Sequence, residues 1–134
     1  MLLSFLGKYR EGAMLFIRAG LGLFLVLHGL PLLTHVSKWH QLGEAMSVVG
    51  MTAYPKFWGL MAALSETVGG ILVIIGLCFR PACLFIAFTL TIATLQHYKN
   101  HDDFNTKLSH SAELAIVFYG LTVIGPGKYG VDKG

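Results

Sequence analysis

Four long apolar stretches constrain this chain more than any other feature of its sequence. They cover residues 13–33, 57–77, 81–98 and 110–125. A helix that crosses a hydrocarbon core of about 30 Å needs roughly 20 residues, with a lower limit of about 17. The first two stretches meet this length and the third is just long enough, while the fourth needs its upstream flank, which places it at 108–125. We therefore expect four membrane-spanning helices.

The composition also favours a membrane protein. Hydrophobic residues make up 54% of the 134 residues and charged residues only 13%, about half the charged fraction of a typical soluble domain. The net charge of +3 is too small to indicate nucleic-acid binding, and no basic cluster with interleaved aromatics occurs. The length suits one domain, so we expect a single four-span domain over residues 1–134, surrounded by the lipid bilayer.

The connections between the spans indicate an up-down-up-down bundle. The "CFRP" link is so short that the second and third spans must be antiparallel neighbours, and Pro81 suits the first turn of the new helix. The 34–56 connection carries apolar residues at helical spacing, namely Trp39, Leu42, Met46 and Val49. This spacing predicts a short amphipathic helix at the interface. The expected fold is an all-α, integral membrane four-helix bundle with that interfacial helix between spans one and two.

Lysines and arginines set the expected orientation. The side that holds both termini carries Lys8, Arg10, Arg80, Lys128 and Lys133, and the other side carries Lys38, Lys56, Lys99 and Lys107. Five against four favours cytoplasmic termini. No cleavage site follows the first apolar run, so we interpret it as a retained span. Cys78 and Cys83 are then free thiols on the reducing side, although the reversed orientation leaves a redox pair open.

Ionisable side chains inside the expected spans are the candidate functional residues, because each costs about 2.5–3.5 kcal/mol at a span centre. They are Arg18, His28, Glu66, His97 and Glu113, with His110 at the edge. With alternating helix directions, all except Arg18 fall in the outer half of the bundle. We expect them to form a polar pocket there for ligand binding or proton relay. Arg18 would either snorkel outward or reach toward Glu66.

The residues alone leave the chemistry of this pocket open. Histidine and carboxylate side chains that face one another bind a metal or haem iron, relay protons, or hydrogen-bond a membrane quinone. His28 and His97 are the candidate haem or metal ligands. His110 and Glu113 share a helix face, but a di-metal bundle needs two such motifs and further carboxylates. A di-metal site is therefore not expected.

A plainer interpretation needs no ligand. Glu66 is then a protonated side chain that hydrogen-bonds Ser65, Thr91 or a backbone carbonyl. His97 and His110, near the membrane boundary, are then ordinary interfacial residues.

Glycines on the first two spans predict close helix packing. Gly22 and Gly29 lie seven residues apart on the first span, and Gly69 and Gly76 have the same spacing on the second. Such small residues let helix backbones approach closely. We therefore expect these glycines to frame the polar pocket.

The stretch "GPGKYG" at 125–130 has the spacing of a dinucleotide-binding loop. That loop must follow a strand and open a helix, whereas this one follows an apolar helix. We expect no dinucleotide at 125–130. Gly125 is placed to cap the helix in the left-handed conformation, and Pro126 prevents the helix from continuing.

Several of these stretches resemble the DoxX family of small four-span membrane proteins. They are "RAGLGLFLVLHG" (18–29), "SETVGGILVIIGLCFRP" (65–81), His97, Glu113 and "GPGKYGVD" (125–132). The family's pattern picks out Arg18, His28, Gly29, Glu66, Gly69, Gly70, Gly76, Arg80, His97, Glu113, Gly125, Pro126 and Gly127. Many members place a lysine shortly after the His-Gly pair. This chain has none before Lys38, which puts a role for that lysine in doubt.

The resemblance implies a multi-pass protein of the bacterial or archaeal cytoplasmic (inner) membrane with redox associations. A related subunit belongs to a thiosulfate:quinone oxidoreductase, and other members look like parts of oxidative-stress complexes. The first hypothesis is therefore a subunit of a quinone-linked oxidoreductase, with quinone rather than haem as its ligand and with other membrane subunits or further copies as partners. The alternatives are a non-enzymatic membrane scaffold for a larger complex and a small-solute or proton carrier.

Overall fold

The computed structural model describes residues 2–35, 37–50, 52–101 and 108–132, and its regular structure is helical. In chain order the elements are η1 (Ser4–Tyr9), α1 (Arg10–Thr34), α2 (Ser37–Gly43), η2 (Glu44–Val49), α3 (Pro55–Ile75), α4 (Phe79–Lys99) and α5 (Ser109–Ile124). The η elements are short 3-10 helices, and η1 runs directly into α1.

Three of these helices are long and apolar enough to cross a membrane. They are the continuous helix Ser4–Thr34, α3 and α4, and α5 is a shorter apolar helix. At about 1.5 Å per residue, the 16 residues of α5 span about 24 Å. The described helices confirm the expected all-α fold class of a small multi-span membrane protein. Residues 102–107, which precede α5, lie outside the described residues.

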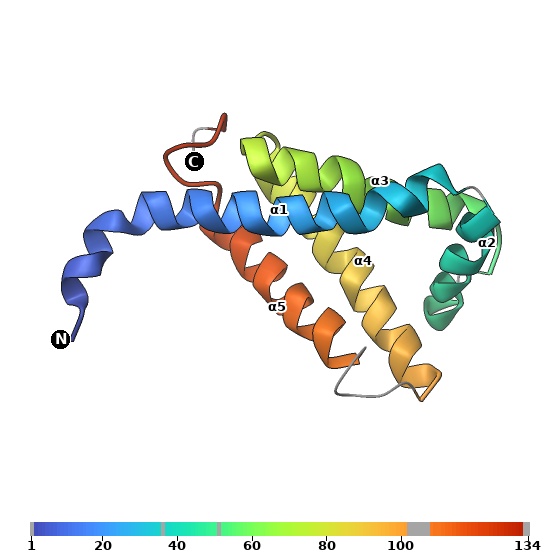
Figure 1. Cartoon of the computed structure of the whole chain (residues 1–134). Helices are drawn as coiled ribbons and strands as arrows, with labels where there is room; N and C mark the ends of the chain where they lie inside the picture. The colour runs from blue at the N-terminus through green and yellow to red at the C-terminus, as the bar shows by residue number, and fades with distance from the viewer. Residues whose placement is uncertain (1, 36, 51, 102–107, 133–134) are drawn as a thin grey trace.

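The helices associate as two pairs. The first span α1 runs beside α3, and α4 runs beside α5 at a steep angle to the first pair (Figure 1). The two pairs are joined through contacts between α3 and α4, and the apolar core is centred on Phe79, Ile86 and Phe118. No described residue of α1 comes within 8 Å of α5 by Cα distance. The bundle is thus closed between α3 and α4 and less tightly closed between α1 and α5.

Glycines account for the close approach of α1 and α3. A Cβ atom built on Gly22 would lie 2.6 Å from the Gly70 carbonyl oxygen, and one on Gly29 would lie 2.7 Å from the Thr67 hydroxyl. Gly69 faces Ile86 of α4 instead. These positions allow backbone contact that any larger residue would prevent.

The connection between α1 and α3 is helical but broken. The expected single amphipathic helix is instead α2 followed by η2, with the change at Gly43. Gly43 packs on the Pro55 backbone, and Gly59 packs on the Trp39 backbone so closely that neither position has room for a side chain. This direct packing of α2 on α3 depends on Gly43 and Gly59, which no sequence pattern above indicates.

The turn between α3 and α4 follows from its residues. Gly76 ends α3 in the left-handed conformation at φ +73°, and its N–H and that of Leu77 both donate to the Leu72 carbonyl. A glycine meets this φ without strain. Pro81 lies in the first turn of α4, as expected, since a proline there removes no helical hydrogen bond.

Residues 125–132 fold back over this turn, and we call them the tail clasp. The N–H groups of Val131 and Asp132 donate to the carbonyls at the end of α3, at 3.1 and 2.9 Å. The Asp132 carboxylate in turn accepts the N–H of Phe79, the first residue of α4, at 2.8 Å. Asp132 thus satisfies a helix-terminal donor that has no partner inside the helix.

The tail clasp also reaches the start of α1. The Lys128 N–H donates to the Glu11 carboxylate at 2.6 Å, and Gly127 packs against Met14. Gly125 has φ +91° and ψ −179°, so the expected left-handed cap is wrong. The extended ψ directs the chain away from the α5 axis, which lets the tail clasp return to α1 and α3.

Candidate functional site

Arg18 lies at the end of the bundle that the tail clasp covers, which we call the closed end. Its Nε donates to the Val73 carbonyl at 3.1 Å, its Nη2 to Ile74 at 2.8 Å and its Nη1 to Pro126 at 3.1 Å. The side chain is 1% exposed. Its guanidinium therefore serves the last carbonyls of α3, where a positive charge is favourable.

This placement differs from both alternatives that the sequence suggested for Arg18. The side chain does not snorkel outward, and it does not reach Glu66, which precedes Val73 by seven residues, or about 11 Å along the helix. The carbonyl oxygens at the end of α3 lie within hydrogen-bonding distance of the guanidinium, whereas the Glu66 carboxyl lies too far along the helix. Gly76 and Gly130 leave room for it, since a Cβ on either would lie within 3.2 Å of Nη1.

His28, Glu66 and His97 lie together at the opposite end, which we call the open end. They line a cavity of about 590 Å³ between α1, α3, α4 and α5. His110 joins them from the first turn of α5. The remaining walls are apolar and come mainly from Leu21, Phe24, Leu25, Leu90, Leu114 and Phe118. We call this the larger cavity.

The contact between His28 and Glu66 is the most polar feature of this cavity. His28 Nε2 lies 3.7 Å from Glu66 Oε2, which is within ion-pair range but too long for a hydrogen bond. Glu66 Oε2 is buried and has no hydrogen-bonding partner among the described residues. The His28 side chain is 72% exposed and that of Glu66 is 12% exposed. A buried carboxyl without a partner is uncommon in proteins and calls for an explanation.

The residues proposed as plain partners of Glu66 are engaged elsewhere. Thr91 donates to the Ala87 carbonyl at 2.8 Å and lies 2.8 Å from the Tyr119 hydroxyl. Ser65 is paired with Thr89 at 3.2 Å. Within the described chain, neither residue hydrogen-bonds Glu66.

Glu113 does not lie in the larger cavity. It is exposed, and its carboxylate accepts a hydrogen bond from the Ser109 hydroxyl one turn earlier, at 3.0 Å. The helical spacing gave its face relative to His110 but not the rotation of α5 against the other helices. Of the two polar residues that open α5, the structure brings His110 and not Glu113 to the cavity.

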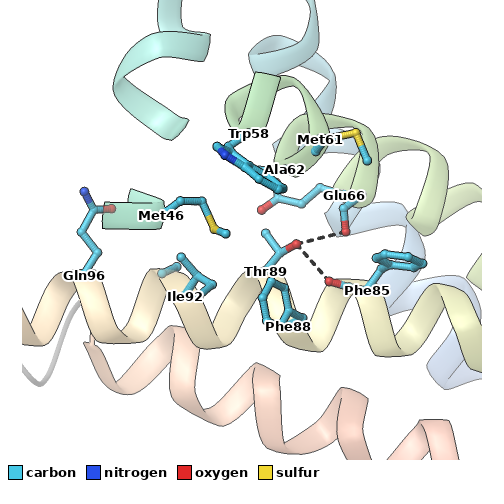
Figure 2. Close-up of a pocket in the computed structure, with 12 residues that line it drawn as sticks. Met46, Trp58, Met61, Ala62, Glu66, Phe85, Phe88, Thr89, Ile92 and Gln96 are labelled. Carbon is cyan, nitrogen blue, oxygen red and sulfur yellow. Dashed lines mark hydrogen bonds between the residues drawn. The ribbon is translucent and has the colours of Figure 1, made fainter. Parts of the chain in front are cut away.

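A smaller cavity of about 170 Å³ lies on the other side of Glu66, between η2, α3 and α4 (Figure 2). Glu66 and Ala93 line both cavities. Met46, Trp58, Met61, Phe85 and Phe88 make much of its wall. No sequence pattern predicts this second cavity, because it depends on how η2 folds over α3 and α4.

The described residues contain no group of three or more His, Cys, Asp or Glu side chains able to hold a metal ion. His28 and His97 share a cavity wall with Glu66 and His110, but no three of these side chains come close enough together to hold one ion. Cys78 and Cys83 are free, the first exposed and the second buried.

Long apolar helices that pack on one another, with polar groups gathered inside, define a small multi-span helical membrane protein. Residues 13–99 match the DoxX family. The match covers more than half of the chain, and the protein belongs to that family. It includes α1 to α4 and stops before α5, so Glu113 and the tail clasp lie beyond it. No curated protein and no solved structure matches the chain.

Proposed function

We propose that this protein is a redox-associated membrane subunit that binds a quinone in the larger cavity. The observation that carries this proposal is the unpartnered Glu66 carboxyl beside His28 in a cavity of about 590 Å³. Ligand cavities commonly measure about 300–1,000 Å³, with apolar walls and a few convergent polar groups. The larger cavity fits that description.

The distribution of polar and apolar side chains favours an amphipathic ligand. A quinone ring carries two carbonyl oxygens that accept hydrogen bonds, and histidine ring N–H groups donate them. His28, His97 and His110 lie on the cavity wall, and His28 lies closest to Glu66 among the contacts described above. Leu21, Phe24 and Phe118 suit the ring and the start of an apolar tail. The tail would leave toward lipid between α1 and α5, whose backbones stay apart.

The place of the cavity in the cell is part of the same proposal. The lysine and arginine bias favours the closed end in the cytoplasm of a bacterial or archaeal cell, which puts the larger cavity in the outer half of the cytoplasmic membrane. A quinone-binding subunit also needs partner proteins that supply or accept electrons. We therefore propose that other membrane subunits accompany this chain.

Quantitative extraction of bound quinone tests the proposal. The protein is purified in lipid nanodiscs from a quinone-containing membrane, and the quinone is measured per protein by chromatography. We expect near-stoichiometric quinone in the wild type. We expect about fivefold weaker quinone binding, and a correspondingly lower quinone content, in His28→Ala and in Glu66→Gln. The first change removes a hydrogen-bond donor worth about 1 kcal/mol, and the second removes the carboxyl that lies 3.7 Å from His28 Nε2 and orients it.

His40→Ala is the matched control. His40 lies on α2, is exposed, and pairs with Glu44 at 3.0 Å away from both cavities. This variant should retain quinone as the wild type does. Quinone at no more than the lipid background in the wild type, with no difference between the variants, would contradict the proposal and favour the scaffold alternative.

A further inference from the structure

The smaller cavity has the features of a second binding site. Its volume is about 170 Å³, and a cavity of about 150 Å³ lined by apolar side chains is large enough to hold a benzene molecule. It is therefore the size of one six-membered aromatic ring with a small substituent. A quinone with a long tail belongs to the larger cavity and does not fit this one.

The walls of the smaller cavity favour an aromatic ring. Met46 approaches from η2, Trp58 and Met61 from α3, and Phe85 and Phe88 from α4 (Figure 2). Aromatic rings pair favourably with other rings, and methionine sulfur contacts ring edges with a gain of about 0.3–1.5 kcal/mol. Three ring-bearing residues and two methionines around one small space are a better match for a ring than for a flexible acyl chain.

One side of this cavity is polar. The Thr89 hydroxyl donates to the Phe85 carbonyl at 2.9 Å (Figure 2), and its oxygen lies 3.2 Å from the Ser65 hydroxyl oxygen. The Ser65 oxygen keeps a lone pair for another donor. Glu66 lies beside Ser65 in the same wall and makes no hydrogen bond within the described chain. The polar side can therefore accept a hydrogen bond from a ligand hydroxyl.

We propose that the smaller cavity binds a neutral, single-ring aromatic molecule with one hydroxyl group, that is, a phenol. The ring lies among Trp58, Met61 and Phe88, and the hydroxyl donates to the Ser65 oxygen, next to Glu66. Since Glu66 also lines the larger cavity, a phenol bound in one cavity contacts a residue of the other. This site differs from the proposed quinone site in its ligand and in all its lining residues except Glu66 and Ala93.

The fluorescence of Trp58 can measure ligand binding in the smaller cavity. The chain has two tryptophans, Trp39 and Trp58, and only Trp58 lines the cavity. In a Trp39→Phe background, indole fluorescence reports on this cavity alone. The probes are para-bromophenol, whose bromine quenches a neighbouring indole, and para-bromotoluene, which has the same ring without a hydroxyl. We expect saturable quenching by both, with the phenol bound about fivefold more tightly, the value of one hydrogen bond.

Two variants complete the experiment, and both leave the larger cavity unchanged. Ser65→Ala should remove most of the preference for the phenol while keeping saturable binding of both probes. Ala62 lines the smaller cavity and not the larger one. Ala62→Leu therefore fills the smaller cavity and should weaken the binding of both probes roughly tenfold or more. Ala19→Leu, an exposed position on α1, is the matched control and should bind like the parent protein.

The outcomes separate this proposal from others. Quenching that rises linearly with either probe and is equal in Ala62→Leu means partition into lipid, and it overturns the proposal. Equal affinity for the two probes overturns the role of the hydroxyl. Quinone retention in Ala62→Leu keeps the two sites distinguishable, because the loss of phenol binding with normal quinone content supports a separate site. Far-UV circular dichroism and a monodisperse elution profile confirm that each variant is folded.

Discussion

The two ends of this bundle treat buried polar groups in opposite ways. At the closed end, all three nitrogens of Arg18 donate to carbonyl oxygens at 2.8–3.1 Å. At the open end, Glu66 Oε2 is buried without a hydrogen-bonding partner among the described residues. The closed end is covered by the tail clasp, whereas the open end borders two cavities.

This difference distinguishes a buried polar group with a structural role from one that is a candidate for ligand binding. Hydrogen bonds from all three guanidinium nitrogens offset the desolvation of a buried arginine, and Arg18 is such a group. A buried carboxyl without a partner stabilises nothing by itself, because its desolvation is not offset. The open end is therefore the better candidate for ligand binding, although sequence alone treats Arg18 and Glu66 as equals.

The largest effect is expected from Arg18→Met. Three carbonyl oxygens lose their donors in this variant, and each unsatisfied buried group costs about 1–3 kcal/mol. We expect the free energy of unfolding to fall by about 3 kcal/mol or more, measured by thermal melting in detergent. Arg18→Lys keeps the charge but not the forked geometry of the guanidinium, so its stability should lie between those of the wild type and Arg18→Met. A wild-type melting temperature for Arg18→Met would remove the distinction between the two ends.

Gly29→Ala should have the next largest effect. The added Cβ would lie 2.7 Å from the Thr67 hydroxyl oxygen and 2.8 Å from Glu66 Cβ. We expect a loss of about 1–3 kcal/mol in thermal stability, because α1 must shift away from α3. Gly20→Ala is the matched control on the same helix. Nothing lies within 4 Å of its added Cβ, so it should be neutral or more stable by up to about 1 kcal/mol.

This pair of glycine variants sharpens the comparison of the two ends. Gly29 lies beside Glu66, at the open end. A large loss for Gly29→Ala with no loss for Gly20→Ala shows that α1 and α3 pack tightly there too. The cavities then arise from the divergence of α1 and α5 and not from loose packing of α1 on α3. Equal effects of the two variants would contradict that account.

Asp132→Ala should have a smaller effect. It removes the carboxylate that accepts the Phe79 N–H at the start of α4, and loss of such a cap costs about 0.5–2 kcal/mol. Asp132→Asn keeps an oxygen acceptor and should lose less. Limited proteolysis after Lys128 offers a second measurement, since release of the tail clasp exposes this residue further. Unchanged melting and proteolysis in Asp132→Ala would mean that the clasp does not secure the closed end.

Glu66→Gln should have the smallest effect on stability. Glu66 Oε2 accepts no hydrogen bond in the described chain, and an amide of the same shape keeps the packing and loses only the 3.7 Å charge contact with His28. We expect a change below about 1 kcal/mol in the same thermal melt, together with the loss of quinone described above. A loss of stability as large as that of Arg18→Met would make Glu66 a structural residue and would overturn the comparison.

The helices themselves follow from local sequence. Predicted spans at 13–33, 57–77 and 81–98 lie within a few residues of α1, α3 and α4, because apolar length and the Gly76 and Pro81 signals act locally. The glycine spacing likewise predicted close packing, and Gly22 and Gly29 do meet α3. The grouping of His28, Glu66 and His97 was predicted from the direction of each span and the position of each residue along it. Both can be inferred from the sequence.

The contacts that decide whether a polar residue is structural or lines the cavity join residues far apart in the sequence. No local sequence pattern predicts them. Arg18 bonds residues 55, 56 and 108 positions away, so only the folded tail clasp shows it to be structural. Glu113 shares a helix face with His110, but the rotation of α5 about its axis left Glu113 outside the larger cavity.

By itself, the sequence determined that the chain is an all-α, multi-span membrane protein of the DoxX family with ionisable groups inside its spans. Hydrophobic length and helix signals are properties of neighbouring residues, so they can be read along the chain. Only the tertiary structure decided which polar groups are satisfied. That depends on how helices rotate and diverge in space. It separates Arg18, whose three guanidinium nitrogens all donate to carbonyls at the closed end, from Glu66 between two cavities.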